Sequence, residues 1–283
     1  MLRLAIQSKG RLSEQSLALL SESGIKVPDS KRTLISHASG LDLEVLYLRD
    51  DDIPQAVAMG VADIGIVGRN VIEEKQEKVS EVMHLGFGAC RLSLAVPATS
   101  GYDGIRWLSG RKIATSYPVI LDRWLKENNI DAGIHVIEGS VEISPALGIA
   151  DAIFDIVSTG STLTSNGLRE VETVMASEAE LVAYPELNEE KRKELEKIVF
   201  RFRSSLDSHG MKYVLMNIPQ ESLDEAIAIL PGMRSPTILK LAQSGWYSIH
   251  SVVPENKLWE SIERLKAIGA EGILVLALEN IIK

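Results

Sequence analysis

An acidic residue inside an apolar run, followed by a loop of small hydroxyl residues, is the most informative feature of the sequence. Asp155 lies within the run 153–157, and the residues after this run are Ser158, Thr159, Gly160, Ser161 and Thr162. A carboxylate in an apolar strand is costly unless it is paired or faces a cleft. Successive N–H groups and hydroxyls can surround a phosphate. The pattern predicts a site for a phosphorylated sugar, with the carboxylate on the ribose hydroxyls; a polar turn locally capped by Asp155 is the alternative.

The elements expected around this site alternate between strand and helix, as in α/β proteins. Strands are expected at the short apolar runs 2–6, 43–48, 62–67, 92–96, 112–115, 134–137 and 153–157. Helices are expected after Ser13 as N-cap (with Leu12 and Leu17 as a hydrophobic staple), from Asp52-Pro54 to Gly60, after Gly68, and at 118–128, 141–147 and 188–205. Ligands of open α/β sheets bind at the carboxyl ends of strands, so the polar turns after these runs are candidate binding segments.

The last part of the chain, 210–283, follows a different plan. Strands are expected at 213–218, 237–242, 247–253 and 272–278, and helices at 222–230 and 255–268. This order, βαββαβ, is the ferredoxin-like arrangement. His209-Gly210 is a plausible boundary before it.

Composition excludes several classes of protein. The chain has 283 residues, 30 Lys plus Arg against 39 Asp plus Glu, and a net charge of −9. This acidic balance argues against general nucleic-acid binding, although a few local cations can still bind a small polyanion.

The sequence has no apolar run that could span a bilayer and no secretion signal, so a cytoplasmic location is expected. Cys90 is the only cysteine; it excludes a disulfide framework and is expected to be a small core residue.

The stretch 142–163 is similar to the signature of the ATP phosphoribosyltransferase family, which opens histidine biosynthesis. At the family's spacing the chain has Glu142, Gly148, Ala150, Ile153, Asp155, Ile156, Thr159, Gly160, Thr162 and Leu163. The resemblance continues through QSKGRL (7–12), ADIGIVGRN (62–70), NGLREVE (166–172) and LPGMRSPTI (230–238). It therefore covers the whole chain.

This resemblance implies a fold and a reaction. The fold would be a bilobal, periplasmic-binding-protein-like catalytic core, with domain I at 1–92 and 179–209 and domain II at 93–178, followed by a ferredoxin-like domain at 210–283. In the family, N1 of ATP attacks the anomeric carbon of phosphoribosyl pyrophosphate, giving phosphoribosyl-ATP and pyrophosphate. Such chemistry relies on positioning and charge stabilisation. Mg²⁺ on the pyrophosphate would need few protein ligands, and no protein metal ligands are predicted.

The resemblance also implies residue roles. Asp155 and Glu142 would be catalytic, although Glu142 in a helix cap or an ion pair is the alternative. Contacts to phosphoribosyl pyrophosphate would come from Asp151, Asp155, Ser158, Thr159, Gly160, Ser161 and Thr162, although Asp151 could instead cap a turn. Contacts to ATP or pyrophosphate would come from Lys9, Gly10, Arg11, Arg49, Asp50, Arg69 and Asn70. A solvated turn at 9–11 and an acidic helix start at 49–52 are the alternatives there.

The C-terminal unit has a regulatory meaning in this family. The long form carries it and is inhibited by histidine, whereas the short form depends on a partner regulatory protein. The resemblance implies a histidine site shared between subunits and formed by Asn217, Met233, Thr237, Val252 and Gly272. It also implies a homodimer as the active form and a homohexamer as the inhibited form. Ordinary domain packing is the alternative for these residues.

Two competing functions remain. A non-catalytic sensor could use the same bilobal fold, but a plain solute binder does not need the DIVSTGST loop at 155–162. A different phosphoribosyltransferase is the other; the usual fold of that class has two adjacent acids before its phosphate loop. This chain has Phe154-Asp155 at that point.

Overall fold

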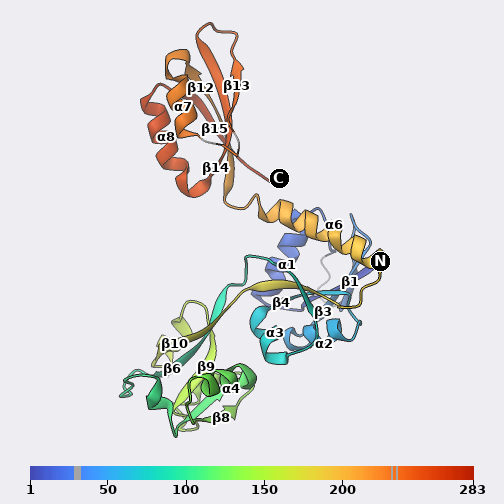
Figure 1. The fold of residues 1–283 in the computed structure, drawn as a ribbon, viewed down its shortest axis with the longest axis vertical. Coiled ribbons are helices and arrows are strands. Elements are labelled where there is room, and N and C mark those ends of the chain that lie inside the picture. Colours follow the sequence, from blue (N-terminus) through green and yellow to red (C-terminus); the bar gives the residue numbers. More distant parts are fainter. Residues whose placement is uncertain (29–32, 231, 234) are drawn as a thin grey trace. The chain divides into compact units, whose positions relative to one another are not determined.

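The computed structural model describes residues 1–28, 33–230, 232–233 and 235–283. Pro231 and Arg234, within the LPGMRSPTI stretch, lie outside the described residues. The chain divides into two compact units, one of Met1–Ser21 with Ile25–Lys197 and one of Glu22–Gly24 with Ile198–Lys283. The described strands form a six-stranded, a five-stranded and a four-stranded sheet (Figure 1).

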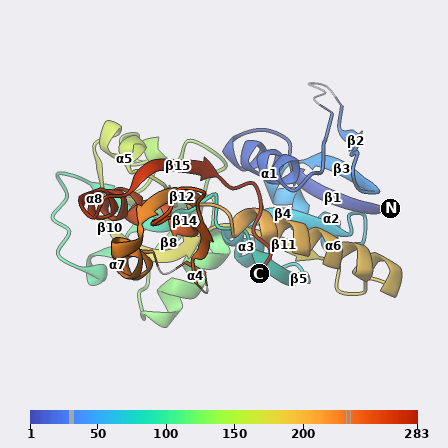
Figure 2. The ribbon, with the colours of Figure 1, turned by 90° about the horizontal axis from the view of Figure 1, so that it is seen from above.

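The first lobe is the part of the first unit that is built on the six-stranded sheet. Its strands, in spatial order, are β2 (Ile35–His37), β3 (Leu43–Leu48), β1 (Leu2–Gln7), β4 (Ile64–Gly68), β11 (Ala179–Ala183) and β5 (Ser80–His84). The neighbours β3, β1 and β4 are parallel and lie side by side (Figure 2). Their carboxyl ends therefore share one edge of the sheet, and the turns that follow them lie close together.

The helices of this lobe follow those turns. They are α1 (Arg11–Glu22), α2 (Ile53–Ala58) after a 3₁₀ turn at Asp50–Asp52, and α3 (Arg69–Lys75); α6 (Glu189–Leu206) runs from this unit into the other. The predicted start of the first helix was wrong. Gly10 has φ +94°, and the N–H of Glu14 donates to the Gly10 carbonyl at 3.1 Å, so the helix begins at Arg11. Ser13 is consequently a buried residue inside the helix rather than its N-cap, and Leu12 does not act as a staple outside it.

The second lobe is built on the five-stranded sheet. Its spatial order is β10 (Leu168–Ser177), β6 (Cys90–Pro97), β9 (Ala152–Val157), β7 (Lys112–Thr115) and β8 (Gly133–Val136). Its helices are α4 (Pro118–Glu127) and α5 (Ser161–Ser165), with 3₁₀ turns at Ile105–Leu108 and Val141–Ile143. A helix over 141–147 was predicted, but only this 3₁₀ turn forms. Pro145 has no N–H to donate to the Val141 carbonyl, so a regular helix cannot continue there.

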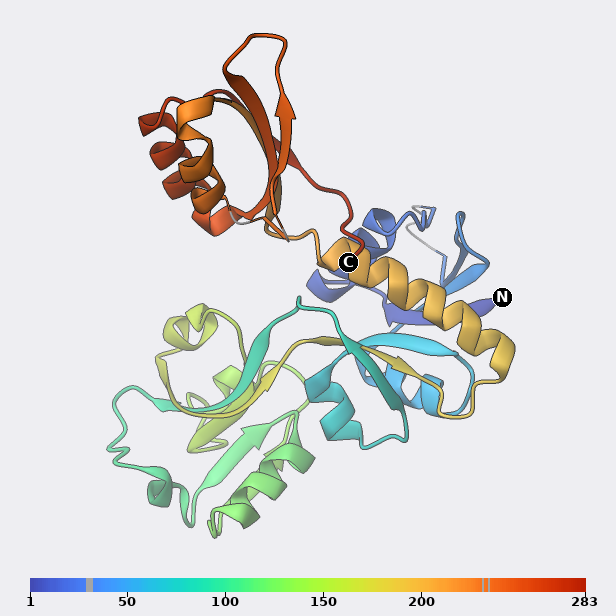
Figure 3. The same cartoon turned by 45° about the horizontal axis from the view of Figure 1, so that its top comes forward.

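Two extended segments connect the lobes (Figure 3). One runs from β5 into β6, and the other runs from β10 into β11 with only Glu178 between these strands. Each lobe has its own apolar core. Ile53, Val57 and Val67 belong to the first core, and Leu94 and Phe154 belong to the second.

The four-stranded sheet forms the C-terminal domain in the antiparallel order β13 (Thr237–Lys240), β14 (Trp246–Pro254), β12 (Met211–Pro219) and β15 (Glu271–Ala277). Two helices, α7 (Leu223–Ile229) and α8 (Leu258–Ala267), cover one face of it (Figures 1 and 3), with 3₁₀ turns at Gln220–Ser222 and Glu255–Lys257. This confirms the predicted ferredoxin-like βαββαβ plan. In the described parts of the chain, no helix is long and apolar enough to cross a membrane.

Candidate functional site

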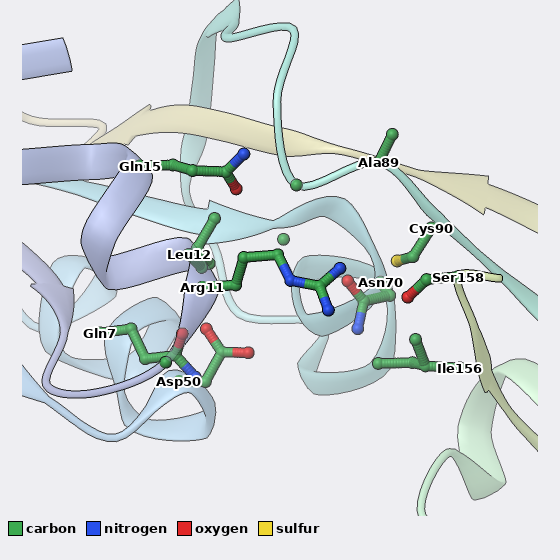
Figure 4. A pocket seen from close by; sticks show the side chains of 13 residues that line it. Gln7, Arg11, Leu12, Gln15, Asp50, Asn70, Ala89, Cys90, Ile156 and Ser158 are labelled. Atoms are coloured by element: carbon green, nitrogen blue, oxygen red, sulfur yellow. The ribbon is translucent and has the colours of Figure 1, made fainter. Parts of the chain in front are cut away.

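A cavity of about 400 Å³ lies where the two lobes meet. The residues that line it are Gln7, Gly10, Arg11, Leu12, Gln15, Asp50, Gly68, Asn70, Gly88, Ala89, Cys90, Ile156 and Ser158 (Figure 4). Gln7, Asp50 and Gly68 stand at or just after the carboxyl ends of the parallel strands β1, β3 and β4. Ile156 and Ser158 come from the end of β9 in the second lobe. The cavity thus occupies the position expected for a ligand of an α/β sheet.

The polar groups of the cavity wall include two without partners. Asp50 Oδ1 and Gln15 Oε1 are buried and have no hydrogen-bond partner among the described residues. Burial, with a smaller contribution from the neighbouring Asp51 carboxylate, raises the pKa of Asp50 to about 6. The Arg11 side chain extends from the start of α1 into the space between Asp50 and Asn70 (Figure 4). The cavity therefore combines one cation with oxygen acceptors that a ligand donor could satisfy.

Asn70 is held rigidly at the cavity wall by both lobes. The Ser177 hydroxyl donates to Asn70 Oδ1 at 2.8 Å and accepts from the Asn70 backbone N–H at 3.0 Å. Asn70 Nδ2 donates to the Tyr117 hydroxyl at 3.2 Å. A Cβ at Gly68 would collide with Asn70 Oδ1, so this close approach requires glycine at position 68.

The predicted phosphate loop has an open hydroxyl surface. Ser158, Thr159, Ser161 and Thr162 are all exposed. Gly160 has φ +80° and is the N-cap residue of α5, a backbone conformation that favours glycine. The Thr159 and Ser161 hydroxyls are 3.0 Å apart. The hydroxyls are therefore accessible to a ligand, while the first N–H of α5, that of Ser161, donates to the Thr159 hydroxyl at 3.4 Å.

A charged pair that the sequence did not reveal fixes this loop. Arg91 on β6 donates to the Glu170 carboxylate on β10 through Nε and Nη2, each at 2.5 Å. Its Nη1 donates to the Ser158 carbonyl at 3.0 Å. The Arg91 hydrogen bonds lower the pKa of Glu170 to about 2. Opposite charges on neighbouring strands were the available signal, but it requires knowing that β6 pairs with β10.

The two acids of the signature lie close enough to interact. Burial raises the pKa of Asp155, the N–H of Ile156 lowers it, and the negative charge of Glu142 raises it further. Asp155 Oδ1 accepts the hydrogen bond from Ile156 N at 2.8 Å. Asp155 therefore makes a local hydrogen bond to the backbone, as the capped-turn alternative predicts, and the negative charge of Glu142 also acts on its carboxyl.

Of the predicted catalytic and substrate-binding residues, only Gly10, Arg11, Asp50, Asn70 and Ser158 line the cavity. The residues that do not line it are Lys9, Arg49, Arg69, Glu142, Asp151, Asp155, Thr159, Gly160, Ser161 and Thr162. Lys9 and Arg49 are exposed on the turns directly before Gly10 and Asp50, which do line it. The Arg69 guanidinium forms a long ion pair, 3.9 Å from the buried Glu180 carboxylate. Asp151 accepts the N–H of Lys112 at 2.8 Å. It precedes β9 whereas Ser158 follows that strand, so about 20 Å of strand separates the two.

Cys90 corrects a prediction about the core. It is only partly buried and lines the cavity rather than filling a core. Burial raises the pKa of its thiol despite an opposing hydrogen bond with Ser177. A thiol with a raised pKa is a weak nucleophile.

In the C-terminal domain, four of the five predicted effector residues belong to the sheet face opposite α7 and α8. Residues of β12 alternate between faces, and Val214, Met216 and Ile218 belong to the core beneath the helices. Asn217 consequently faces the other way, as Thr237 and Val252 do by their register. Gly272, with φ +60°, follows Glu271, the residue that pairs with Asn217 at a register shift. The Asn217 Nδ2 would be 3.3 Å from a Cβ at Gly272. Met233 is half exposed in the segment before β13.

This same face carries a polar network that the sequence did not reveal. The Tyr213 hydroxyl is 2.9 Å from His250 Nδ1, and the Ser248 hydroxyl is 3.1 Å from His250 Nε2. Leu239, Leu274 and Leu276 on this face are about half exposed. The face therefore combines hydrogen-bonding groups with uncovered apolar surface.

Comparison with known proteins gives consistent matches over both parts of the chain. Residues 49–204 match the family model described as ATP phosphoribosyltransferase, and residues 208–280 match the model described as HisG, C-terminal domain. The chain is 57% identical over 282 residues to the ATP phosphoribosyltransferase of Bacteroides thetaiotaomicron, with 100% of each chain covered. It is 53% identical to that of Cytophaga hutchinsonii, covering 100% of this chain and 99% of the relative.

A solved structure agrees with these matches. The ATP phosphoribosyl transferase (HisG:HisZ) complex from Thermotoga maritima contains a chain that is 30% identical, with a TM-score of 0.61. The match covers 71% of this chain and 98% of the Thermotoga chain.

Proposed function

Because the chain belongs to the ATP phosphoribosyltransferase family, pentosyltransferases of histidine biosynthesis, we propose how its residues divide the work of this reaction. The reaction transfers the phosphoribosyl group of phosphoribosyl pyrophosphate to N1 of ATP. The N1–C1′ bond forms while the bond from C1′ to the pyrophosphate oxygen breaks, giving phosphoribosyl-ATP and pyrophosphate. One observation supports our assignment most: Ser158, the first residue of the loop, lines the same cavity as Arg11 and Asn70 of the other lobe.

The sugar phosphate is assigned to the second lobe. The exposed hydroxyls of Ser158, Thr159, Ser161 and Thr162, with the backbone at Gly160, would surround the 5′-phosphate. The Asp155 carboxyl would accept hydrogen bonds from the ribose hydroxyls. Asp151 is left out of this assignment because it lies at the opposite end of β9.

ATP and the leaving pyrophosphate are assigned to the first lobe. Arg11, Gly10 and Asn70 line the cavity, and Arg11 supplies its positive charge. Lys9 and Arg49 would approach from the neighbouring turns, since both side chains are exposed beside lining residues. Arg69 is left out because its guanidinium pairs with Glu180.

The chemistry requires little covalent help from the protein. The adenine nitrogen is already a nucleophile, and the sugar passes through a state with positive charge at C1′. Asp155 and Glu142 would stabilise that charge, because carboxylates in a desolvated site interact strongly with it. The two lobes would hold N1 and C1′ in line, which is the other main source of rate acceleration.

A Mg²⁺ ion goes with this assignment as the partner of the pyrophosphate. The described residues contain no group of three or more potential metal ligands, but an ion held mainly by substrate oxygens needs few from the protein. Asp50 fits as one ligand, because its Oδ1 is a hard oxygen, buried at the cavity and without a partner among the described residues. When bound, the ion would neutralise charge on the leaving pyrophosphate.

Domain roles complete the proposal. Residues 1–92 with 179–209 and residues 93–178 would form the two catalytic domains, and 210–283 the regulatory domain, supported by the distribution of strands among three sheets. Histidine would inhibit through Asn217, Met233, Thr237, Val252 and Gly272.

A homodimer and a homohexamer are proposed as assembly states, since the half-exposed Leu274 and Leu276 suit a subunit interface. A cytoplasmic location is proposed because both substrates are polyanions that do not cross bilayers unaided.

The direct test is product formation by the purified protein. With ATP, phosphoribosyl pyrophosphate and Mg²⁺, mass spectrometry should detect phosphoribosyl-ATP, and omission of any one component should abolish it. The Asp155→Asn variant serves as the matched control for contaminating activity. Folded protein that yields no product would refute the assignment.

A further inference from the structure

The helix α4 of the second lobe lacks an N-terminal cap of its own. Tyr117 is at the N-cap position and makes no side-chain cap hydrogen bond, and Pro118 follows it. Proline has no N–H, so Val119 and Ile120 carry the first N–H groups of the helix that need acceptors. Ser, Thr, Asp or Asn usually provides such an acceptor at the N-cap.

Glu74 of the first lobe supplies what α4 lacks. Its Oε1 accepts the N–H of Val119 at 3.0 Å, and its Oε2 accepts the N–H of Ile120 at 3.0 Å. The Glu74 side chain lies on α3 and is buried, with 8% of its surface exposed. A buried carboxylate is stable only when it is well hydrogen-bonded, and both of its oxygens are used here. The positive end of the α4 dipole favours this charge as well.

The contact is directly coupled to the cavity. Asn70 precedes Glu74 by one helical turn, so both side chains lie on the same face of α3. Asn70 lines the cavity and donates to the hydroxyl of Tyr117, the residue at the start of α4. The same two helices share a third contact at the surface, where Arg123 donates to Glu73 at 2.9 Å.

We propose that Glu74 is a positioning residue: by capping α4 from α3, its carboxylate fixes the separation of the two lobes across the cavity. This inference rests on the proposed function, in which the sugar phosphate is held by the second lobe and ATP by the first. Each substrate would then bind to groups of its own lobe, while the distance between N1 and C1′ depends on the Glu74 contact. Loss of the contact should affect turnover more than the affinity for either substrate alone.

Three variants of the full-length protein test this role. Glu74→Asp keeps the charge but shortens the side chain by one methylene, so it cannot reach both N–H groups at the present lobe separation. Glu74→Ala removes the cap. Glu73→Ala is the matched control, because it removes the exposed pair between the same two helices. The first measurement is amide hydrogen exchange at Val119 and Ile120 without substrates. Glu74→Ala should speed exchange by about tenfold, and Glu73→Ala should leave it unchanged.

The second measurement separates positioning from stability. Dissociation constants for ATP and for phosphoribosyl pyrophosphate, each alone, are measured by calorimetry and compared with kcat. Glu74→Asp should lower kcat by about tenfold, because small misplacements of reacting groups are costly, while both dissociation constants stay within about twofold.

The outcomes are distinct. Unchanged exchange in Glu74→Ala, or a wild-type kcat in Glu74→Asp, would overturn the inference, and so would an equal loss of kcat in Glu73→Ala. A wild-type protein that makes no product would instead refute the proposed function, while the exchange measurement would still test the contact itself.

Discussion

The Arg91 guanidinium joins the Glu170 carboxylate on the neighbouring strand through two hydrogen bonds of 2.5 Å while its third nitrogen holds the Ser158 carbonyl at 3.0 Å. Planar, bidentate pairs of this kind give geometric precision as well as energy. The start of the loop 158–162, which we propose as the phosphate site, is therefore held at the Ser158 carbonyl by a charged pair on β6 and β10.

Replacing Arg91 with alanine should weaken the binding of phosphoribosyl pyrophosphate and leave the affinity for ATP unchanged. The released Ser158 carbonyl lets the loop sample other conformations, so the dissociation constant for phosphoribosyl pyrophosphate should rise by about tenfold. Calorimetry with each substrate alone measures this. Arg106→Ala is the control, since Arg106 also donates to a backbone carbonyl of this lobe, that of Asn129. An equal effect on ATP would contradict the expected separation.

The loop itself can be tested at two positions. Thr162→Ala removes an exposed hydroxyl, and Asp155→Asn removes the carboxylate charge, so both should weaken binding of phosphoribosyl pyrophosphate more than binding of ATP. A loss on the order of 1–2 kcal/mol is expected for a hydrogen bond to a charged group. Thr164→Ala is a suitable control because its hydroxyl donates to the Gly160 carbonyl within the helix. If Thr162→Ala binds the sugar phosphate normally, the loop has been misassigned.

Asp50 should make the ligand-free protein less stable as pH rises. Its folded pKa, about 6, exceeds the ordinary value of 3.8. The protonated carboxyl is thus favoured by folding, and this contribution is complete below about pH 4 and lost as pH rises through 6. Asp50→Asn should therefore raise the free energy of unfolding by on the order of 1 kcal/mol at pH 7.5 and have little effect at pH 4. Denaturant unfolding at both pH values measures it, and a destabilised variant at pH 7.5 would disprove the argument.

The Cys90 thiol should report on the cavity. Because burial raises its pKa, alkylation by iodoacetamide at pH 7.5 should be slower than that of free cysteine and should accelerate with pH. ATP or phosphoribosyl pyrophosphate should slow it further by covering the cavity. Mass spectrometry of the intact protein follows the single modification. Alkylation that neither substrate slows would show that they bind elsewhere.

The proposed histidine site predicts a variant that keeps its catalytic activity but is no longer inhibited by histidine. Asn217→Ala should leave turnover in the absence of histidine unchanged and should raise the histidine concentration needed for half-inhibition by at least about tenfold. Sedimentation velocity with and without histidine tests whether the change of assembly is lost with it. Gln243→Ala, exposed in the same domain, is the control. Normal inhibition of Asn217→Ala would exclude this residue from the effector site.

Local patterns predicted most of the elements, because their apolar spacing reflects one buried face. Strands β2, β5, β10 and β11 and the short helix α5 were not predicted. Two helix predictions were also wrong, each where a single residue set the backbone. Gly10 starts α1 earlier than Ser13 suggested, and Pro145 prevents the helix expected over 141–147. Neither effect, nor the missed strands, changes the α/β class, so the predicted fold class was still correct.

The candidate site could be predicted from the sequence only where its residues are neighbours along the chain. The loop after Asp155 and the turn at Gly10-Arg11 are continuous segments, and Ser158 of the first lines the same cavity as Gly10 and Arg11 of the second. Arg69 and Asp151 have side chains that interact with groups distant in sequence, Glu180 and Lys112, which local spacing cannot reveal. The same limit hid the Arg91–Glu170 pair and the capping of α4 by Glu74.

The order of strands in the first sheet has a consequence for how the chain folds as it leaves the ribosome. Among the described strands β5 pairs only with β11, and β11 also completes the pairing of β4. All five strands of the second lobe are synthesised between β5 and β11. The five strands of the second lobe can thus pair before β11 is synthesised, and until then the edge of β4 that pairs with β11 stays unpaired. Such edges invite mispairing, so the rate at which residues 85–183 emerge sets how long the nascent chain is exposed to aggregation.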